Sequence, residues 1–366
     1  MSTKLLQSVA NSNNLYYIED TMLSIGPHSM DSEKAPIVIS ILQNCLISFR
    51  AFLATITTLS RLSYDDTKPF AEAIPIIVSA LGKWYKDADF CRTALKVLRT
   101  LAGPNDWRLS AEAGGIPLFI AILERHINST SICEQACFGL KAMLTAPHPD
   151  LMVPNYHDLD RVIETGGLKT LLNLLDEHYA HDEVCVNSLY IVDQIVPHTN
   201  LEPVKAELIS LLVDFLKYRC TNRCIVEHAC SILVNNTFMI EKIKHYDDIV
   251  NSLINIVEDY LYDAKICKLA LNTLAKLDIT NAQFQHDTQT IRNIFLAVQD
   301  QHAYDDTIIN PSAGLLHSIA NKSFEKHPHF LYPYEHSGYC DICGAHGEKF
   351  MACVDCDYDE CMLCNH

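Results

Sequence analysis

The chain has 366 residues, of which 49% are hydrophobic and 20% are charged, and its formal net charge is −17. This composition is that of a folded protein, and the acidic balance argues against nucleic acid or an anionic membrane as a partner. Because no apolar run could cross a bilayer and the first residues lack a signal-peptide core, we expect no membrane insertion and a cytoplasmic location. Nine of the 15 cysteines lie scattered in helical patterns, which indicates a reducing compartment.

The N-terminal part of the chain reads as a series of helices. Residues 1–30 contain a short helical stretch, which we interpret as a capping segment because the end repeats of a stacked array are atypical. Two helical patterns fill 34–63, and two more cover 70–86 and 88–102. In the last of these, apolar residues recur three, four, seven and ten positions after Cys91, as one face of a helix requires.

The apolar stripe of 88–102 recurs along the chain, in steps of 39 to 42 residues with one step of 52. Its first positions are Phe52, Cys91, Cys133, Cys185, Val226, Cys267 and Ile309. Three positions later the residue is always small: Thr55, Ala94, Ala136, Ser188, Ala229, Ala270 and Ser312. Such a period is typical of a repeat protein, and we predict that the seven helices pack side by side in one layer.

Two of the repeats carry a Gly-Gly pair between a short helical pattern and a longer one. Gly114-Gly115 follows the short pattern 106–113, and Gly166-Gly167 follows 159–165. A glycine at the end of a helix favours the left-handed conformation, which permits a sharp bend into the next helix.

The step of 52 residues results from an insertion at 147–158, whose three prolines predict a loop. The sequence leaves open whether this insertion contributes to binding. After residue 200 the short first helix of the repeat is no longer evident, and the helical patterns come in pairs.

The phrases EAGGIPLFIAIL and ETGGLKTLLNLL, each followed by a longer helix, resemble armadillo repeats. This resemblance implies an all-α, armadillo-like α-solenoid of about seven repeats over 31–325, whose third helices line a groove that binds proteins. The Trp and Asn ladder of armadillo proteins that carry nuclear import signals is absent, apart from Asn235. Phe138 and Tyr190 occupy Trp positions on adjacent repeats and form either a contact patch or part of the packing between helices.

No motif for catalysis is evident in the repeats. The sequence contains no phosphate-binding glycine loop, no G-x-S-x-G and no H-E-x-x-H. We therefore predict that the chain is not an enzyme.

Residues 326–366 form a separate region that is rich in cysteine and histidine. Its six cysteines form three C-x2-C pairs, a spacing that suits tetrahedral zinc: Cys340, Cys343, Cys353, Cys356, Cys361 and Cys364. Six thiolates are too many for one four-ligand site and two short of two sites. The candidates for the missing ligands are His327, His329, His336, His346 and His366.

The region resembles ZZ fingers in its run CVDCDYDECMLC, and diacylglycerol-type fingers in the His that precedes the first cysteine. The two C-terminal histidines of the ZZ pattern are not present in this sequence. Both families imply a small cross-brace zinc finger with two zinc ions. Carried over to this sequence, one site takes Cys340, Cys343, Cys361 and Cys364, and the other takes Cys353, Cys356, His327 and His329. His366 is the alternative to His329.

The charges suggest which partners the chain binds. Residues 327–366 contain one lysine and seven acidic residues, which disfavours a lipid headgroup. The −11 charge on residues 1–326 predicts basic protein partners. Two binding surfaces, the groove and the finger, indicate a scaffold or adaptor protein. We expect this scaffold to belong to a cytoskeletal or axonemal assembly, and therefore to lie in the cytoskeleton or cilium. The alternative is a ubiquitin-pathway or N-degron-type recognition factor that uses the finger.

Overall fold

A computed structural model describes residues 3–25, 32–60, 68–147, 156–200, 204–237, 246–277, 279, 282–323, 332–339, 346–353 and 358–361. The chain divides into two compact units, unit 1 (Met1–Thr199) and unit 2 (Asn200–His366). Each unit is described by itself.

The described part of unit 1 is helical. Its α-helices are α1 (Thr3–Ala10), α2 (Leu15–Ser24), α3 (Ala35–Cys45), α4 (Phe49–Leu59), α5 (Ile74–Trp84), α6 (Ala88–Leu101), α7 (Trp107–Glu112), α8 (Gly115–Arg125), α9 (Thr130–Thr145), α10 (Tyr156–Glu164), α11 (Gly167–Glu177) and α12 (Asp182–Ile195). Short 3-10 segments cover Ser32–Lys34, Lys68–Ala73 and Val196–His198.

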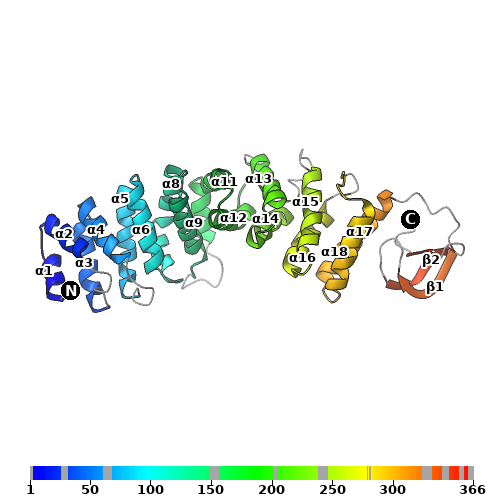
Figure 1. Cartoon of the computed structure of the whole chain (residues 1–366), viewed down its shortest axis with the longest axis horizontal. Coiled ribbons are helices and arrows are strands. Elements are labelled where there is room, and N and C mark those ends of the chain that lie inside the picture. Colours follow the sequence, from blue (N-terminus) through cyan, green and yellow to red (C-terminus); the bar gives the residue numbers. More distant parts are fainter. Residues whose placement is uncertain are drawn as a thin grey trace. The chain divides into compact units, whose positions relative to one another are not determined.

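Two layers of helices make up unit 1. Helices α4, α6, α9 and α12 each contact the next, and α2 contacts α4 at the start of the same layer. Helices α5, α8 and α11 run alongside them as a second row (Figure 1). The predicted N-terminal segment therefore extends the layer of third helices through α2.

Unit 2 contains helix pairs and a small sheet. The helices are α13 (Lys205–Tyr218), α14 (Arg223–Asn235), α15 (Tyr246–Asp259), α16 (Ala264–Lys276), α17 (Thr288–Gln301) and α18 (Asp306–Ser323). Helix α16 contacts both α14 and α18, and α15 contacts both α13 and α17, so two layers form here as well. Strands β1 (Tyr332–Tyr339), β2 (His346–Cys353) and β3 (Tyr358–Cys361) form an antiparallel sheet in the order β1-β2-β3.

The predicted repeat is confirmed within each unit. The stripes that begin at the seven predicted positions lie on α4, α6, α9 and α12 in unit 1, and on α14, α16 and α18 in unit 2. The small residue at the third position is fully buried in all seven helices. A short side chain at this position lets neighbouring helices approach closely, which explains why it recurs.

The cysteine that recurs at the first stripe position also makes a hydrogen bond. The thiol of Cys91 donates to the carbonyl of Tyr85 (3.1 Å), and the thiol of Cys267 donates to the carbonyl of Tyr260 (3.1 Å). Cys133 and Cys185 make the same kind of contact in their repeats. Each thiol thus satisfies a carbonyl at the end of the preceding helix. Burial raises the pKa of Cys133 to about 12, so these thiols are inert at neutral pH.

Both Gly-Gly pairs bend the chain as predicted. Gly114 (φ 86°) and Gly166 (φ 75°) adopt the left-handed conformation and precede α8 and α11. The second glycine of each pair allows a close backbone approach. A Cβ at Gly115 would lie 2.6 Å from the carbonyl oxygen of Ser110.

The predicted loop at 147–158 was wrong for its last three residues, because α10 begins at Tyr156. Asp158 lies in the first turn of this helix and is fully buried. It accepts a hydrogen bond from Arg108 (2.5 Å), and Arg161 lies 3.7 Å away. A paired carboxylate in the first turn favours helix formation, and this outweighs the loop tendency of the nearby prolines.

Candidate functional site

In unit 1, the third helices of the repeats are the ones that carry the buried stripe, namely α4, α6, α9 and α12. The side of these helices that carries half-exposed side chains between the stripe positions is called the third-helix face of unit 1. Phe138 on α9 is half-buried there. The guanidinium carbon of Arg99 lies 4.2 Å from its ring centroid, and Trp107 packs edge-on at 5.9 Å. Phe138 is therefore held between a cation and an indole with part of its ring open to solvent.

The same arrangement recurs one repeat later. The ammonium of Lys141 lies 4.7 Å from the ring centroid of Tyr190, which is also half-buried. In both cases the cation lies eight residues after the first stripe position of its own helix. The ring lies five residues after the first stripe position of the next third helix. Phe138 and Tyr190 are thus half-exposed rings that a cation from the preceding third helix covers, and not fully buried packing residues.

Carboxylates connect the same helices. Arg99 Nη1 lies 3.3 Å from Glu134 Oε1, which joins α6 to α9. Burial raises the pKa of Glu134, and the hydrogen bond with Glu183 on α12 raises it further. The charge of Arg99 opposes this rise.

The α4–α6 part of this face is basic, in contrast to the chain as a whole. It carries Arg50, Arg92, Lys96 and Arg99, while Asp89 pairs with Arg92 (2.6 Å). Within the part of the chain that the structure describes, the side chains of Arg50 and Lys96 have no hydrogen-bonding or ionic partner. Two cations are thus available to a ligand on this face.

The predicted metal ligands fall mostly outside the described residues. Only Cys353 and Cys361 lie within them, at the last positions of β2 and β3. In the sheet, Cys353 is opposite Tyr358, and Cys361 is opposite Phe350. Six predicted ligands lie outside the description: Cys340, Cys343, Cys356, Cys364, His327 and His329. No group of three or more His, Cys, Asp or Glu that could hold a metal occurs among the described residues.

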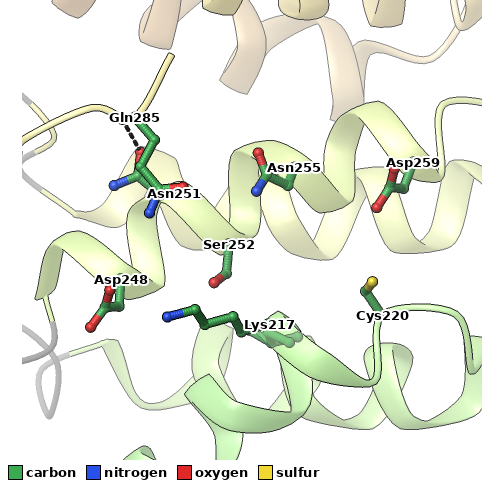
Figure 2. A pocket seen from close by; sticks show the side chains of 9 residues that line it. Lys217, Cys220, Asp248, Asn251, Ser252, Asn255, Asp259 and Gln285 are labelled. Carbon is green, nitrogen blue, oxygen red and sulfur yellow. Dashed lines mark hydrogen bonds between the residues drawn. The ribbon is translucent and has the colours of Figure 1, made fainter.

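Two pockets lie between successive second helices, one in each unit. In unit 1 the pocket between α8 and α11 is lined by Glu124, Lys169, Thr170 and Asn173. In unit 2 the pocket between α13 and α15 has a volume of about 90 Å³ and is lined mostly by polar side chains (Figure 2). Neither pocket was predicted from the sequence. An alignment of the second helices would have found them, because T-x-x-N at Thr170 and S-x-x-N at Ser252 occupy the same repeat position.

Comparison with known proteins supports the fold. No protein-family model matches the sequence, and no curated protein matches it either. Among solved structures, an engineered protein from the Northeast Structural Genomics Consortium matches at 16% identity and a TM-score of 0.52, over 87% of this chain and 79% of that one. A structure from work on a phosphorylation switch in the interaction between cadherin and beta-catenin matches at 14% identity and a TM-score of 0.61.

The second match covers 87% of this chain, and this chain spans 64% of that structure. At these identities the comparison concerns the fold alone. Together with the two triple-helix repeats and their Gly-Gly bends, it shows that the chain has an armadillo-repeat-like helical solenoid fold. None of the helices in the described ranges has the length and apolar character that crossing a membrane requires.

Proposed function

We propose that the chain is a non-enzymatic protein-binding scaffold, and that the third-helix face of unit 1 holds an extended, acidic segment of a partner protein. The carrying observation is the half-exposed ring of Phe138 beneath Arg99, together with the cations Lys96, on the same helix as Arg99, and Arg50, on the preceding third helix. Aromatic rings and arginines are the side chains that contribute most to protein interfaces, and the cations supply charge complementarity.

The net charge predicts a basic partner, whereas the basic part of the third-helix face favours an acidic one. The charge of −11 on residues 1–326 predicts basic partners at long range, but contact affinity depends on the charges at the contact surface. On α4 and α6 these charges are mainly positive. The fold also supports a binding role, since the beta-catenin work cited above concerns an interaction between two proteins.

Peptide binding tests this proposal. Fluorescence anisotropy at low salt would compare an (Asp-Glu)4 peptide with a (Lys-Arg)4 peptide on the full chain. We expect tighter binding of the acidic peptide, and about fivefold weaker binding in Lys96→Glu, which corresponds to about 1 kcal/mol. Lys268→Glu is the matched control, because it makes the same charge change at an exposed position on α16. A preference for the basic peptide, or equal losses in both variants, contradicts the proposal.

We also propose that residues 326–366 form a cross-brace finger that binds two zinc ions and gives the scaffold a second binding surface. The ligands are Cys340, Cys343, Cys361 and Cys364 for one ion, and Cys353, Cys356, His327 and His329 for the other. Thiolate and imidazole are the donors that structural zinc prefers, and bound zinc would supply folding free energy to this small region.

The strand register keeps Cys353 and Cys361, which we assign to different zinc ions, at different positions along the sheet. Cys340 comes after the last residue of β1 in the sequence, and β3 runs antiparallel to β2 toward that end but stops at Cys361, which is opposite Phe350 near the middle of β2. At the other end, Tyr332 is opposite Ala352, next to Cys353.

Native mass spectrometry of the full chain tests the zinc proposal. Two zinc ions per chain are expected, and Cys343→Ser should weaken both while the repeats stay folded. His329→Ala and His366→Ala distinguish the two candidates for the last ligand. One zinc ion that is unaffected by changing His327 and His329 would contradict the second site. The cytoskeletal or axonemal setting and the ubiquitin-pathway alternative stay predictions.

A further inference from the structure

The pocket between α13 and α15 has an equivalent in unit 1. The lining residues differ at several positions, and one of these differences concerns the partner of a hydroxyl group. Thr170 and Ser252 both lie 15 residues before the first stripe position of their repeat, and Asn173 and Asn255 both lie 12 before it. From the preceding repeat, unit 1 contributes Glu124 and unit 2 contributes Lys217, each nine residues before its own stripe.

In unit 1 the hydroxyl group has an internal partner. Thr170 Oγ1 donates to the carboxylate of Glu124 (2.8 Å). In unit 2 the residue at the Glu124 position is a lysine, which has three donors and cannot accept the hydroxyl proton. Ser252 is only 6% exposed, and within the described residues its hydroxyl has no hydrogen-bond partner. Figure 2 shows this hydroxyl directed toward the side chain of Lys217.

The wall of the pocket around Ser252 is held in place. Asn251 donates to the carbonyls of Asp247 and Gln283 (both 2.8 Å) and accepts from the amide of Gln285 (2.8 Å). His286 Nε2 hydrogen bonds to the side-chain oxygen of Asn255 (2.8 Å). These bonds fix the linker before α17 against α15, so the pocket is preformed.

The charges around Ser252 define what the pocket accepts. Ser252 and Lys217 can both donate a hydrogen bond to an acceptor oxygen. In unit 1 the carboxylate of Glu124 is the acceptor for the equivalent hydroxyl. Asp248 lies beside the ammonium of Lys217, and Asp259 lines the far end of the pocket (Figure 2). Two carboxylates against one ammonium disfavour an anionic ligand. They favour a neutral group that offers both an acceptor oxygen and N–H donors.

We propose that this pocket binds the carboxamide of an asparagine or glutamine side chain from a protein partner. The carbonyl oxygen accepts from Ser252 and Lys217, and the amide N–H groups donate to Asp248. A cavity of about 90 Å³ is large enough for a group of this size. The site lies in unit 2 and does not depend on the face proposed above for acidic segments.

Methyl NMR of the full chain provides a readout, because Leu216 lines the pocket. Titration with propionamide, the analogue of a glutamine side chain, should shift the Leu216 methyl signals in a saturable way. Propionate has the same shape with a negative charge, and it should bind more weakly. Ser252→Ala should reduce the affinity for propionamide about fivefold, the ratio expected for one hydrogen bond.

Two more variants complete the test. Lys217→Glu places a carboxylate where unit 1 has Glu124, so Ser252 gains an internal partner and the response of Leu216 should disappear. Thr170→Val changes only the equivalent hydroxyl in unit 1 and should leave the response unchanged. The proposal is overturned by no saturable shift with propionamide, by equal or tighter binding of propionate, or by an unchanged affinity in Ser252→Ala.

Discussion

Unit 1 and unit 2 each contain a layer of third helices, but the second helices that pack beside these layers begin in different ways. In unit 1, α8 and α11 begin at left-handed glycines with no side-chain cap. In unit 2, the second helix α17 begins at Asp287, whose side chain accepts a hydrogen bond from the backbone amide of Thr290 (2.8 Å). The glycine lets a short first helix turn directly into the second, whereas a side-chain cap starts a helix after an open link. The layer therefore depends on the buried stripe and not on how each helix begins.

Filling the glycine bend should have the largest effect on unit 1. In Gly115→Val, the new side chain would meet the carbonyl of Ser110 and the sulfur of Met143, which lies 2.8 Å from an ideal Cβ. Because backbone cannot move aside easily, we expect a loss of about 3 kcal/mol. Hydrogen exchange of peptides from α7 to α9 would measure it. Unchanged protection there would show that the bend is not a packing constraint.

Overpacking the stripe in unit 2 should be nearly as damaging. Ala229 is fully buried at the small position of α14, so Ala229→Leu should cost about 2 kcal/mol. Thermal unfolding of the variant measures this cost. A neutral result would mean that the third-helix layer of unit 2 is loosely packed, and that the two units do not share one packing rule.

The conformation of the first glycine should matter less than the space at the second. A Cβ at Gly114 meets nothing within 4 Å, but its φ of 86° is unfavourable for alanine. Gly114→Ala should therefore cost about 1 kcal/mol. Gly82→Ala is the matched control, since Gly82 lies inside α5 with equally open space and should become slightly more stable. Equal effects in the two variants would contradict a role for the left-handed bend.

The smallest effect is expected from the ion pairs that join α14 to α16. Burial opposes ionisation of Glu227, but the hydrogen bond and charge of Lys265 and the charge of Arg223 lower its pKa overall. A lowered pKa means that this stabilisation is present above the usual pKa of glutamate and is lost as pH falls through the lowered value. Lys265→Ala should cost less than about 1 kcal/mol at pH 7. The difference from wild type in chemical denaturation should vanish in acid, and a constant difference would contradict the assignment.

Much of the fold could be predicted from the sequence because the same residue types recur at the same positions of each repeat. The stripe that begins at Cys91 and the bends at Gly114 and Gly166 predict helices and turns through local geometry. The contact of Arg99 with Phe138 was not predicted, since it depends on the offset between neighbouring repeats. The role of the Ser252 hydroxyl was not predicted either. It becomes evident only when the pocket around Ser252 is compared with the pocket around Thr170, whose hydroxyl has an internal partner.

The central claim is that the third-helix face of unit 1 binds a partner protein, and comparative affinity purification from the source cell tests it most directly. The bait would be the full chain, as wild type, as Lys96→Glu combined with Phe138→Ala, and as the control Lys268→Glu. We expect that at least one protein captured by wild type and by the control is lost with the double variant, and that this protein contains an acidic segment. An identical set of captured proteins for all three baits would contradict it.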